Sequence, residues 1–237
     1  MRATSSYRER ASESPLIVCA WEQVTAAPRE QRVLPDACVD LLWRGERLLI
    51  AGPDSRARLV ALAAGERIVG VRLRPGVAGA VLGLPAGELR DGSPDAGEVI
   101  GRAAAGRLLD ALLGGAEPHA LLAHAIARRG AGRADPLVVA AVLALGRPRV
   151  RVAELARELG VSARQLQRRV GDGAGLGPKA LSRVLRLHRL RTLPPAPLAE
   201  LALDAGYADQ AHMTAEVTQL AGIPPVRFLK DWASRAA

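Results

Sequence analysis

The chain has 237 residues, 49% of them hydrophobic but only 3% aromatic, so it can form one large or two modest domains with cores of Leu, Val, Ile and Ala. Two cysteines are too few for a disulfide framework or a four-cysteine zinc site. The first residues are polar, so we expect no signal peptide there. No run approaches the roughly 20 apolar residues of a membrane helix. The net charge is +9, concentrated in residues 147–237, which carry 15 Lys and Arg against 8 Asp and Glu, whereas residues 1–146 carry 18 against 16. We therefore expect a soluble cytoplasmic protein without membrane contact, with a basic last third that suits nucleic acid.

The first part of the chain has the pattern of a small β domain. Residues 1–13 are charged and Ser-rich, and we expect a disordered tail there. Four apolar stretches bounded by turn residues follow and predict strands: Leu16–Trp21, Val39–Trp43, Leu48–Ile50 and Ile68–Arg74. The alternation in the last stretch predicts one buried face. The expected structure is a small antiparallel sheet or partial barrel.

After Pro75 the apolar spacing becomes helical. A short helical run ends at Leu82, and longer helices are expected over 97–113, 118–129 and 136–145. Asp135 followed by Pro136 is typical of an N-cap and a first helical position. Gly146–Pro148 is a plausible boundary, which predicts an N-terminal sensory or dimerisation domain over 14–146 and a second domain over 147–237.

The second domain is expected to contain only helices and an internal repeat. Val152–Val161 recurs as Leu198–Tyr207 at an offset of 46 residues, and Val170, Gly175 and Pro178 recur at an offset of 47. Each copy reads as helix, glycine turn, second helix, then Gly-x-x-Pro. Helices are predicted over 152–159, 163–170, 178–192, 198–205, 209–219 and 225–235. The fold class is therefore α+β, with two helix-turn-helix units joined by a connector helix.

The first unit has the features of a DNA-reading element. Its inward positions are apolar, Gly160 suits the turn, and Ser162 with Gln165 predicts a capping box. Ser162 and the outward side chains near the start of the second helix are the candidate DNA contacts: Arg164, Gln165, Arg168 and Arg169. Arg suits guanine and Gln suits adenine in the major groove. A solvated helix face is the alternative interpretation of each arginine taken singly.

The second unit is less basic. Its candidate DNA contacts are Asp209, Gln210, His212 and Thr214, with Met213 and Val217 pointing inward. His212 could instead serve helix packing. Because this helix carries fewer long donors, we expect it to contribute less affinity.

Residues 150–237 resemble the AraC/XylS family of bacterial transcription regulators. The matching segments are Leu155–Ser162, Gly175–Pro178, Arg186–Leu190, Leu201–Tyr207 and Gly222–Pro225, with Phe228. The resemblance implies that the two units enter successive major grooves of operator or promoter DNA, with Arg164, Gln165 and Arg168 reading one block and Gln210, His212 and Thr214 the other. It further suggests RNA polymerase, a small-molecule effector and a second copy of the chain as candidate partners. The sequence departs from the family pattern at two places. The family favours Phe where this chain has Val170, and a basic residue followed by Phe where it has Ala215–Val217.

The N-terminal domain gives weaker indications. Trp21, Trp43, Asp40, Cys38 and Arg72 are candidates for a pocket, although core packing is the favoured interpretation of the tryptophans and of Cys38. No cofactor, metal ion or catalytic residue is predicted, so we expect a regulator and not an enzyme. Two alternatives stay open: a DNA-modifying or metabolite enzyme that carries this DNA-binding module, and an interaction protein that has lost DNA binding.

Overall fold

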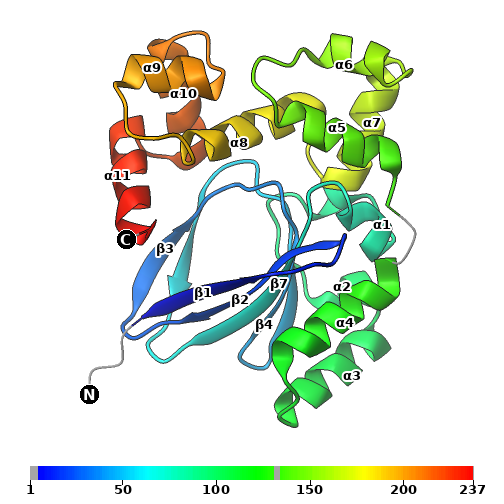
Figure 1. Cartoon of the computed structure of the whole chain (residues 1–237). Coiled ribbons are helices and arrows are strands. Elements are labelled where there is room, and N and C mark those ends of the chain that lie inside the picture. Colours follow the sequence, from blue (N-terminus) through cyan, green and yellow to red (C-terminus); the bar gives the residue numbers. More distant parts are fainter. Residues whose placement is uncertain (1–4, 131–133, 237) are drawn as a thin grey trace.

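The protein forms an N-terminal antiparallel sheet with flanking helices, followed by an all-helical region. The computed structural model describes residues 5–130 and 134–236. Figure 1 shows the C-terminal helices lying along one side of the strands. The strands are β1 (Ser6–Ala11), β2 (Ile17–Val24), β3 (Arg29–Val33), β4 (Asp40–Arg44), β5 (Arg47–Ala51), β6 (Arg58–Leu62) and β7 (Arg67–Leu73).

Two sheets are built from these strands. The larger sheet has the order β1-β2-β7-β4-β5, all antiparallel, and β3 pairs with β6 in a smaller one. The buried face predicted for β7 is present, because Val69, Val71 and Leu73 are fully buried against helices. The other face is largely covered as well, since Ile68 is buried and Gly70 lies under the ring of Trp21. The expected four strands are present, and β1, β3 and β6 are additional.

The prediction of a disordered tail over residues 1–13 is wrong for its second half. Residues 6–11 form β1, which pairs with β2 in register from Ser6 opposite Val24 to Ala11 opposite Cys19. Five of its six residues are exposed. An edge strand is held by backbone hydrogen bonds and needs no apolar alternation, so its charged sequence gave no strand signal. Residues 1–4 lie outside the described part of the chain.

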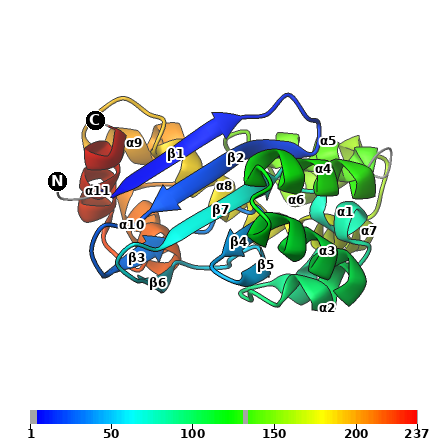
Figure 2. The same cartoon turned by 90° about the horizontal axis from the view of Figure 1, so that it is seen from below.

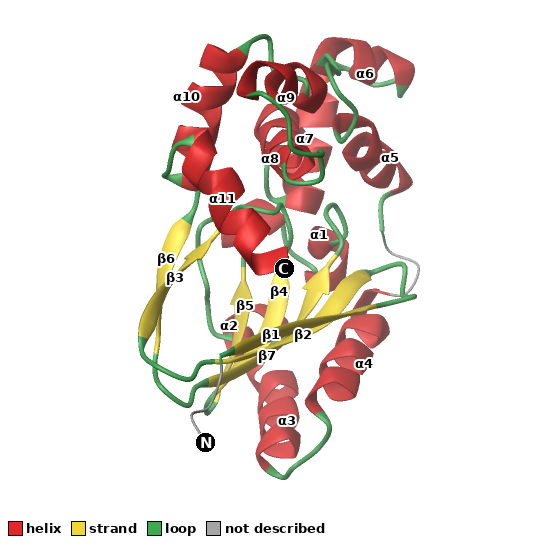
Figure 3. Cartoon of the chain, turned by 60° about the vertical axis from the view of Figure 1, so that its left-hand side comes forward, coloured by secondary structure: helices red, strands yellow, loops and turns green. Residues whose placement is uncertain are grey.

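Helices cover one face of the large sheet. They are α1 (Ala78–Leu82), the 3₁₀ helix η1 (Ala86–Leu89), α2 (Ala96–Ile100), α3 (Arg102–Leu113) and α4 (Pro118–Gly130). The helix expected over 97–113 is broken at Gly101, which has a φ of +91°. Figure 3 shows α3 and α4 on the side of the sheet opposite the C-terminal helices.

The C-terminal region contains the repeated helix pairs. Its helices are α5 (Pro136–Leu145), α6 (Val152–Glu158), α7 (Ala163–Ala174), α8 (Pro178–Leu190), α9 (Leu198–Ala205), α10 (Gln210–Ala221) and α11 (Pro225–Ala236). Helices α6–α7 and α9–α10 are the two units, and α8 connects them. Among the described helices, none is long and apolar enough to cross a membrane.

Helix α5 precedes the domain boundary expected at Gly146. The predicted cap is present, since the Asp135 carboxylate accepts the N–H of Leu137 at 3.0 Å, and α5 spans the predicted residues. However, Val138, Ala141 and Leu145 are buried in one core with α7 and α8. A helix that is apolar on every side packs on several neighbours, and the sequence could not show which ones. Helix α5 therefore packs with the helices of the C-terminal region.

Helix α7 packs closely on the N-terminal domain because small residues allow it. A Cβ atom added to Gly79 of α1 would lie 2.2 Å from the carbonyl oxygen of Asp172 in α7. A Cβ on Gly173 would lie 3.0 Å from the carbonyl oxygen of Gly76. Figure 2 shows this contact at one end of the molecule, while β3 and β6 lie beside α10 and α11 at the other. The N-terminal domain therefore underlies both repeated units.

This close approach makes Gly79 sensitive to substitution. We expect Gly79→Ala to lower the free energy of unfolding by about 1–3 kcal/mol, the usual cost of overpacking, because the methyl group would meet backbone. Gly106→Ala in α3 is the matched control, since its Cβ would meet nothing within 4 Å. There alanine should stabilise by about 0.4–1 kcal/mol. Urea unfolding measures both, and equal effects at the two glycines would contradict the packing argument.

Candidate nucleic-acid interface

The first helix-turn-helix unit is α6 and α7. Leu155 and Ala156 of α6 and Leu166 and Val170 of α7 are buried in the C-terminal core. Between the helices, Gly160 adopts a φ of +67°, a left-handed conformation that glycine takes at little cost. The local signals in the sequence therefore produce the predicted turn.

The predicted capping box at the start of α7 is confirmed. The N–H of Gln165 donates to the hydroxyl oxygen of Ser162 at 3.2 Å, and the N–H of Ser162 donates to Oε1 of Gln165 at 2.8 Å. These contacts satisfy two backbone donors at the helix start. Ser162 thus has a structural task, while the amide nitrogen of Gln165 stays available.

The outward face of α7 is cationic. Arg164 and Arg168 are exposed and stand four residues apart, so they lie on one side of the helix. Within residues 5–130 and 134–236 neither guanidinium has a hydrogen-bond or ion-pair partner. Two adjacent guanidinium groups and the Gln165 amide nitrogen can therefore meet a polyanion without breaking an existing contact.

The guanidinium group of Arg169 is engaged in an ion pair within the protein. Its Nε and Nη2 donate to the two carboxylate oxygens of Asp135 at 2.8 and 2.6 Å. This hydrogen bonding from Arg169 holds the pKa of Asp135 below its usual value. The bidentate pair fastens α7 to the start of α5, a contact that sequence spacing could not reveal because 34 residues separate the partners.

The second unit is α9 and α10. Tyr207, Met213 and Val217 are fully buried, and Gly206 forms the turn with a φ of +93°. Asp209 is the N-cap, because its carboxylate accepts the N–H of His212 at 2.7 Å. Gln210 is exposed, and the Thr214 hydroxyl donates to the carbonyl of Gln210 at 2.8 Å.

The side chain of His212 packs against the protein on one edge and is exposed to solvent on the other. Its ring meets Tyr207 edge-on with centroids 5.5 Å apart, and its Nδ1 accepts the N–H of Ala208 at 3.2 Å. Its Nε2 lies 3.5 Å from Glu216, and the side chain is 41% exposed. The ring is thus held in one orientation with its outer edge accessible.

The departure from the family pattern at Glu216 has a structural explanation. Glu216 is 8% exposed and points to α8, where Arg183 lies 3.0 Å and Arg186 3.6 Å from its carboxylate. The guanidinium of Arg186 also lies 5.0 Å from the centre of the Tyr207 ring. These contacts attach α10 to the connector. The inward spacing of Glu216, three residues after Met213, was a signal that sequence analysis did not use.

Similar solved structures are distant. An apo variant of ToxT from Vibrio cholerae is 9% identical with a TM-score of 0.46 and covers 93% of this chain and 99% of that chain. Unsaturated fatty acid-bound wild-type ToxT is 10% identical with a TM-score of 0.42, covering 97% and 96%. The C-terminal domain of AraT, a response regulator from Geobacillus stearothermophilus, is 20% identical with a TM-score of 0.39, covering 41% and 86%. No curated protein matches the chain.

Two protein families match the sequence directly. Residues 12–95 match a domain of unknown function (DUF6597), and residues 155–231 match a helix-turn-helix domain that spans both repeated units. The helix-turn-helix match covers the segment that resembles the AraC/XylS family and supports that resemblance. It supports a DNA-binding transcription regulator.

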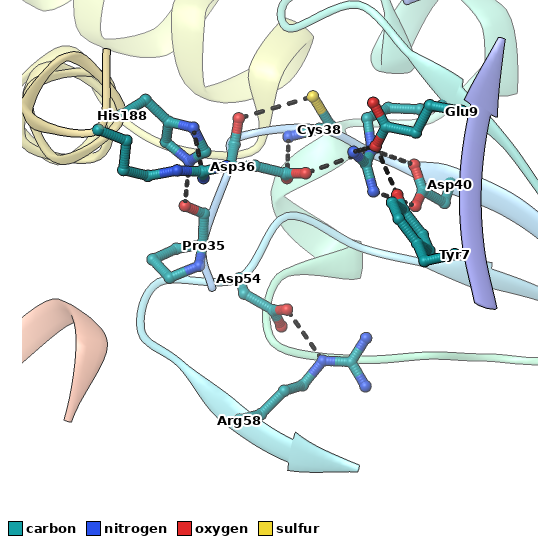
Figure 4. Close-up of polar contacts among 11 residues, drawn as sticks. Tyr7, Glu9, Pro35, Asp36, Cys38, Asp40, Asp54, Arg58 and His188 are labelled. Carbon is teal, nitrogen blue, oxygen red and sulfur yellow. Dashed lines mark hydrogen bonds and ion pairs between the residues drawn. The ribbon is translucent and has the colours of Figure 1, made fainter. Parts of the chain in front are cut away.

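The loop over residues 34–38 inserts among the C-terminal helices. Ala37 has a φ of +61° and is 1% exposed within the core of the C-terminal helices. Nε2 of His188, on α8, lies 2.8 Å from the carbonyl oxygen of Pro35, as Figure 4 shows. The loop therefore joins the sheet to the connector helix.

A partly buried ion cluster holds the base of this loop. Arg72 of β7 lies 3.2 Å from Asp40 and 3.3 Å from both Asp36 and Glu9. Burial raises the pKa of Asp40 to about 6, although Arg72 beside it acts in the opposite direction. Three residues that sequence analysis considered for a pocket lie here: Arg72 donates to Asp40, and the N–H of Cys38 donates to Asp36. Figure 4 shows Asp40, Asp36 and Cys38.

Removing Arg72 should leave a buried charge without compensation. We expect Arg72→Ala to lower the free energy of unfolding at pH 7 by about 2–4 kcal/mol, a range reduced from that of fully buried pairs because the side chain is 23% exposed. Arg74→Ala, on an exposed side chain of the same chain segment, is the control and should have a small effect. Urea unfolding of the three proteins gives the comparison.

The pH dependence of the stability loss in Arg72→Ala follows from the titration of Asp40. The folded-state pKa of Asp40, about 6, exceeds the roughly 3.9 of an Asp in an unfolded chain. As the pH falls from 6 towards 4, the folded state therefore binds the proton before the unfolded state does, and protonation of Asp40 increases the free energy of unfolding. Without Arg72 this pKa rises further. The deficit of Arg72→Ala relative to the parent should therefore shrink between pH 7 and pH 5; a constant or growing deficit would contradict the charge argument.

Proposed function

We propose that this regulator binds DNA sequence-specifically by placing the starts of α7 and α10 in successive major grooves. The observation that carries the proposal is the pair of exposed, unpartnered arginines, Arg164 and Arg168, beside Gln165 on a helix whose other side is fully used for packing. The N-terminal part of the second helix of such a unit is the part that reaches base edges.

The two units contribute unequally. In the first, Arg164, Gln165 and Arg168 supply long donors for guanine, adenine and phosphate. In the second, Gln210, His212 and Thr214 occupy the corresponding surface, with Asp209 as a negatively charged cap close by. We therefore assign most of the phosphate affinity to α7 and a smaller, base-reading contribution to α10. Ser162 and Arg169 we assign to positioning α7.

We propose that the N-terminal domain modulates this activity. The loop over residues 34–38 in the C-terminal core and the glycine contacts of α7 provide a direct mechanical connection. We also propose the limits of the two domains, with the division before Pro136. An effector, RNA polymerase and a second copy of the chain stay predictions from the family resemblance.

The chemistry of the cysteines weighs against the enzyme alternative. Cys19 and Cys38 are both buried free thiols. Burial raises the pKa of Cys19 to about 11 and that of Cys38 well above its ordinary value. A cysteine nucleophile has to be available as thiolate near neutral pH, and these environments suppress it.

The binding site on DNA can be obtained by selection from a random library with the full chain. We expect an asymmetric site of two short blocks about one helical turn apart. Arg164→Ala and Arg168→Ala should each weaken specific binding by about 1–3 kcal/mol, because a guanidinium contact to a base or phosphate is lost. Arg107→Ala, which removes an equally exposed charge from α3, should leave affinity unchanged. Titrations at several salt concentrations separate the phosphate contribution from base reading.

The outcomes separate the alternatives. If neither arginine variant changes the affinity for the selected DNA, the assignment of α7 as the reading helix is wrong. If the parent shows only salt-sensitive binding without sequence preference, or none, the interaction protein becomes the better interpretation.

A further inference from the structure

The two recognition helices end in equivalent turns, and the N-terminal domain contacts both. Helix α7 ends at Gly175 with a φ of +77°, and α10 ends at Gly222 with a φ of +68°. These glycines are 47 residues apart and correspond in the repeat. At each turn, the left-handed conformation of the glycine ends the helix, and the last carbonyl groups of the helix then need hydrogen-bond donors from outside it.

At the first turn the donor is Arg90, which follows η1. Its Nε donates to the carbonyl oxygen of Gly175 at 2.9 Å. The turn is also enclosed, since a Cβ on Gly175 would lie 2.3 Å from the ring of Pro53 and 2.8 Å from the carbonyl oxygen of Ala86. A cation at a helix C-terminus also interacts favourably with the helix dipole.

At the second turn the corresponding donor is Arg32 of β3. Its Nη1 donates to the carbonyl oxygen of Ala221 at 3.1 Å, and the N–H of Ala57 donates to that of Leu220 at 2.6 Å. A Cβ on Gly222 would lie 2.9 Å from Arg32. Both helices are thus capped by an arginine from the other domain.

One loop contacts both turns. Residues 52–58 reach from the first turn, at Pro53, to the second, at Ala57. The Asp91 carboxylate, next to Arg90, accepts the N–H and the hydroxyl of Ser55 at 2.6 and 2.8 Å. Asp54 is 6% exposed and binds Arg58 at 2.9 Å (Figure 4). The distance between the two caps is therefore fixed within the N-terminal domain.

We propose that Arg32 and Arg90 are positioning residues that fix the separation of α7 and α10, and thereby set the spacing of DNA blocks that this regulator accepts. The proposal rests on the proposed function, since only two-helix docking makes spacing matter. Without the two arginines, the turns would lose these side-chain donors, while the shared C-terminal core, α8 and the Ala57 hydrogen bond would still connect the two units.

The spacing requirement can be measured with the selected DNA site. One base pair is inserted or deleted between the blocks, and affinity is measured for the full-length parent and for the Arg32→Ala/Arg90→Ala double variant. We expect the parent to lose about tenfold per change, comparable to a mismatched base pair, and the double variant to lose less than about threefold. The Arg47→Ala/Arg107→Ala variant removes two exposed charges outside the contact and should behave as the parent.

A distance measurement tests the caps without DNA. Spin labels are attached through Ala163→Cys and Ala211→Cys, exposed positions at the starts of the two helices, while Cys19 and Cys38 are buried. We expect a narrow distance distribution in the parent and a wider one in Arg32→Ala/Arg90→Ala. Arg32→Lys/Arg90→Lys keeps a charged donor and should restore part of the narrowing. Circular dichroism establishes that each variant is folded.

Each result has a defined meaning. An unchanged distance distribution in the folded double variant overturns the role of the caps. A wider distribution with the spacing penalty of the parent overturns the link to spacing. If the parent selects no two-block DNA site, the proposed function fails, and the link to spacing fails with it, while the distance measurement still decides whether the arginines hold the helices.

Discussion

The contact between the two domains is the constraint on which the rest of the structure depends. Ala37, in a left-handed conformation that disfavours a side chain, is buried among the C-terminal helices, so its strain is offset by that packing. The same loop carries Pro35, which meets His188 of the connector, and Asp36, which meets Arg72 of the sheet. This loop therefore connects the sheet near Arg72 to the connector between the two helix-turn-helix units.

Sequence reasoning worked where a structural signal is local. The capping box of Ser162 and Gln165, the N-cap Asp135 and the apolar faces of α7 and α10 each lie within one turn of a helix, and all could be predicted. Contacts between distant segments left no such trace. The strand β1 is charged and exposed, the partner of Arg169 lies 34 residues away, and α5 is apolar on every side, so pattern alone could not assign them.

The same division applies to the candidate site. Exposure of Arg164 and Arg168 follows from their spacing relative to Leu166 and Val170, whereas the commitment of Arg169 required coordinates. The repeated residues are thus those that build the helix-turn-helix scaffold, and not those proposed to contact DNA. Its inward residues recur, its outward residues differ, and Glu216 shows that an acidic residue on a recognition helix can belong to the scaffold.

In the proposed function, the two ends of each recognition helix serve different partners. The starts of α7 and α10 are exposed, with Arg164 and Gln210 free to meet DNA, while their last turns are capped by the N-terminal domain. A domain docked at the far end does not have to leave for DNA to bind. Such an arrangement suits control by geometry, in which a shift of the N-terminal domain changes the relative placement of the helices without covering their reading surface. The close glycine contacts favour this mode, because packing that admits no extra methyl group transmits small displacements instead of absorbing them.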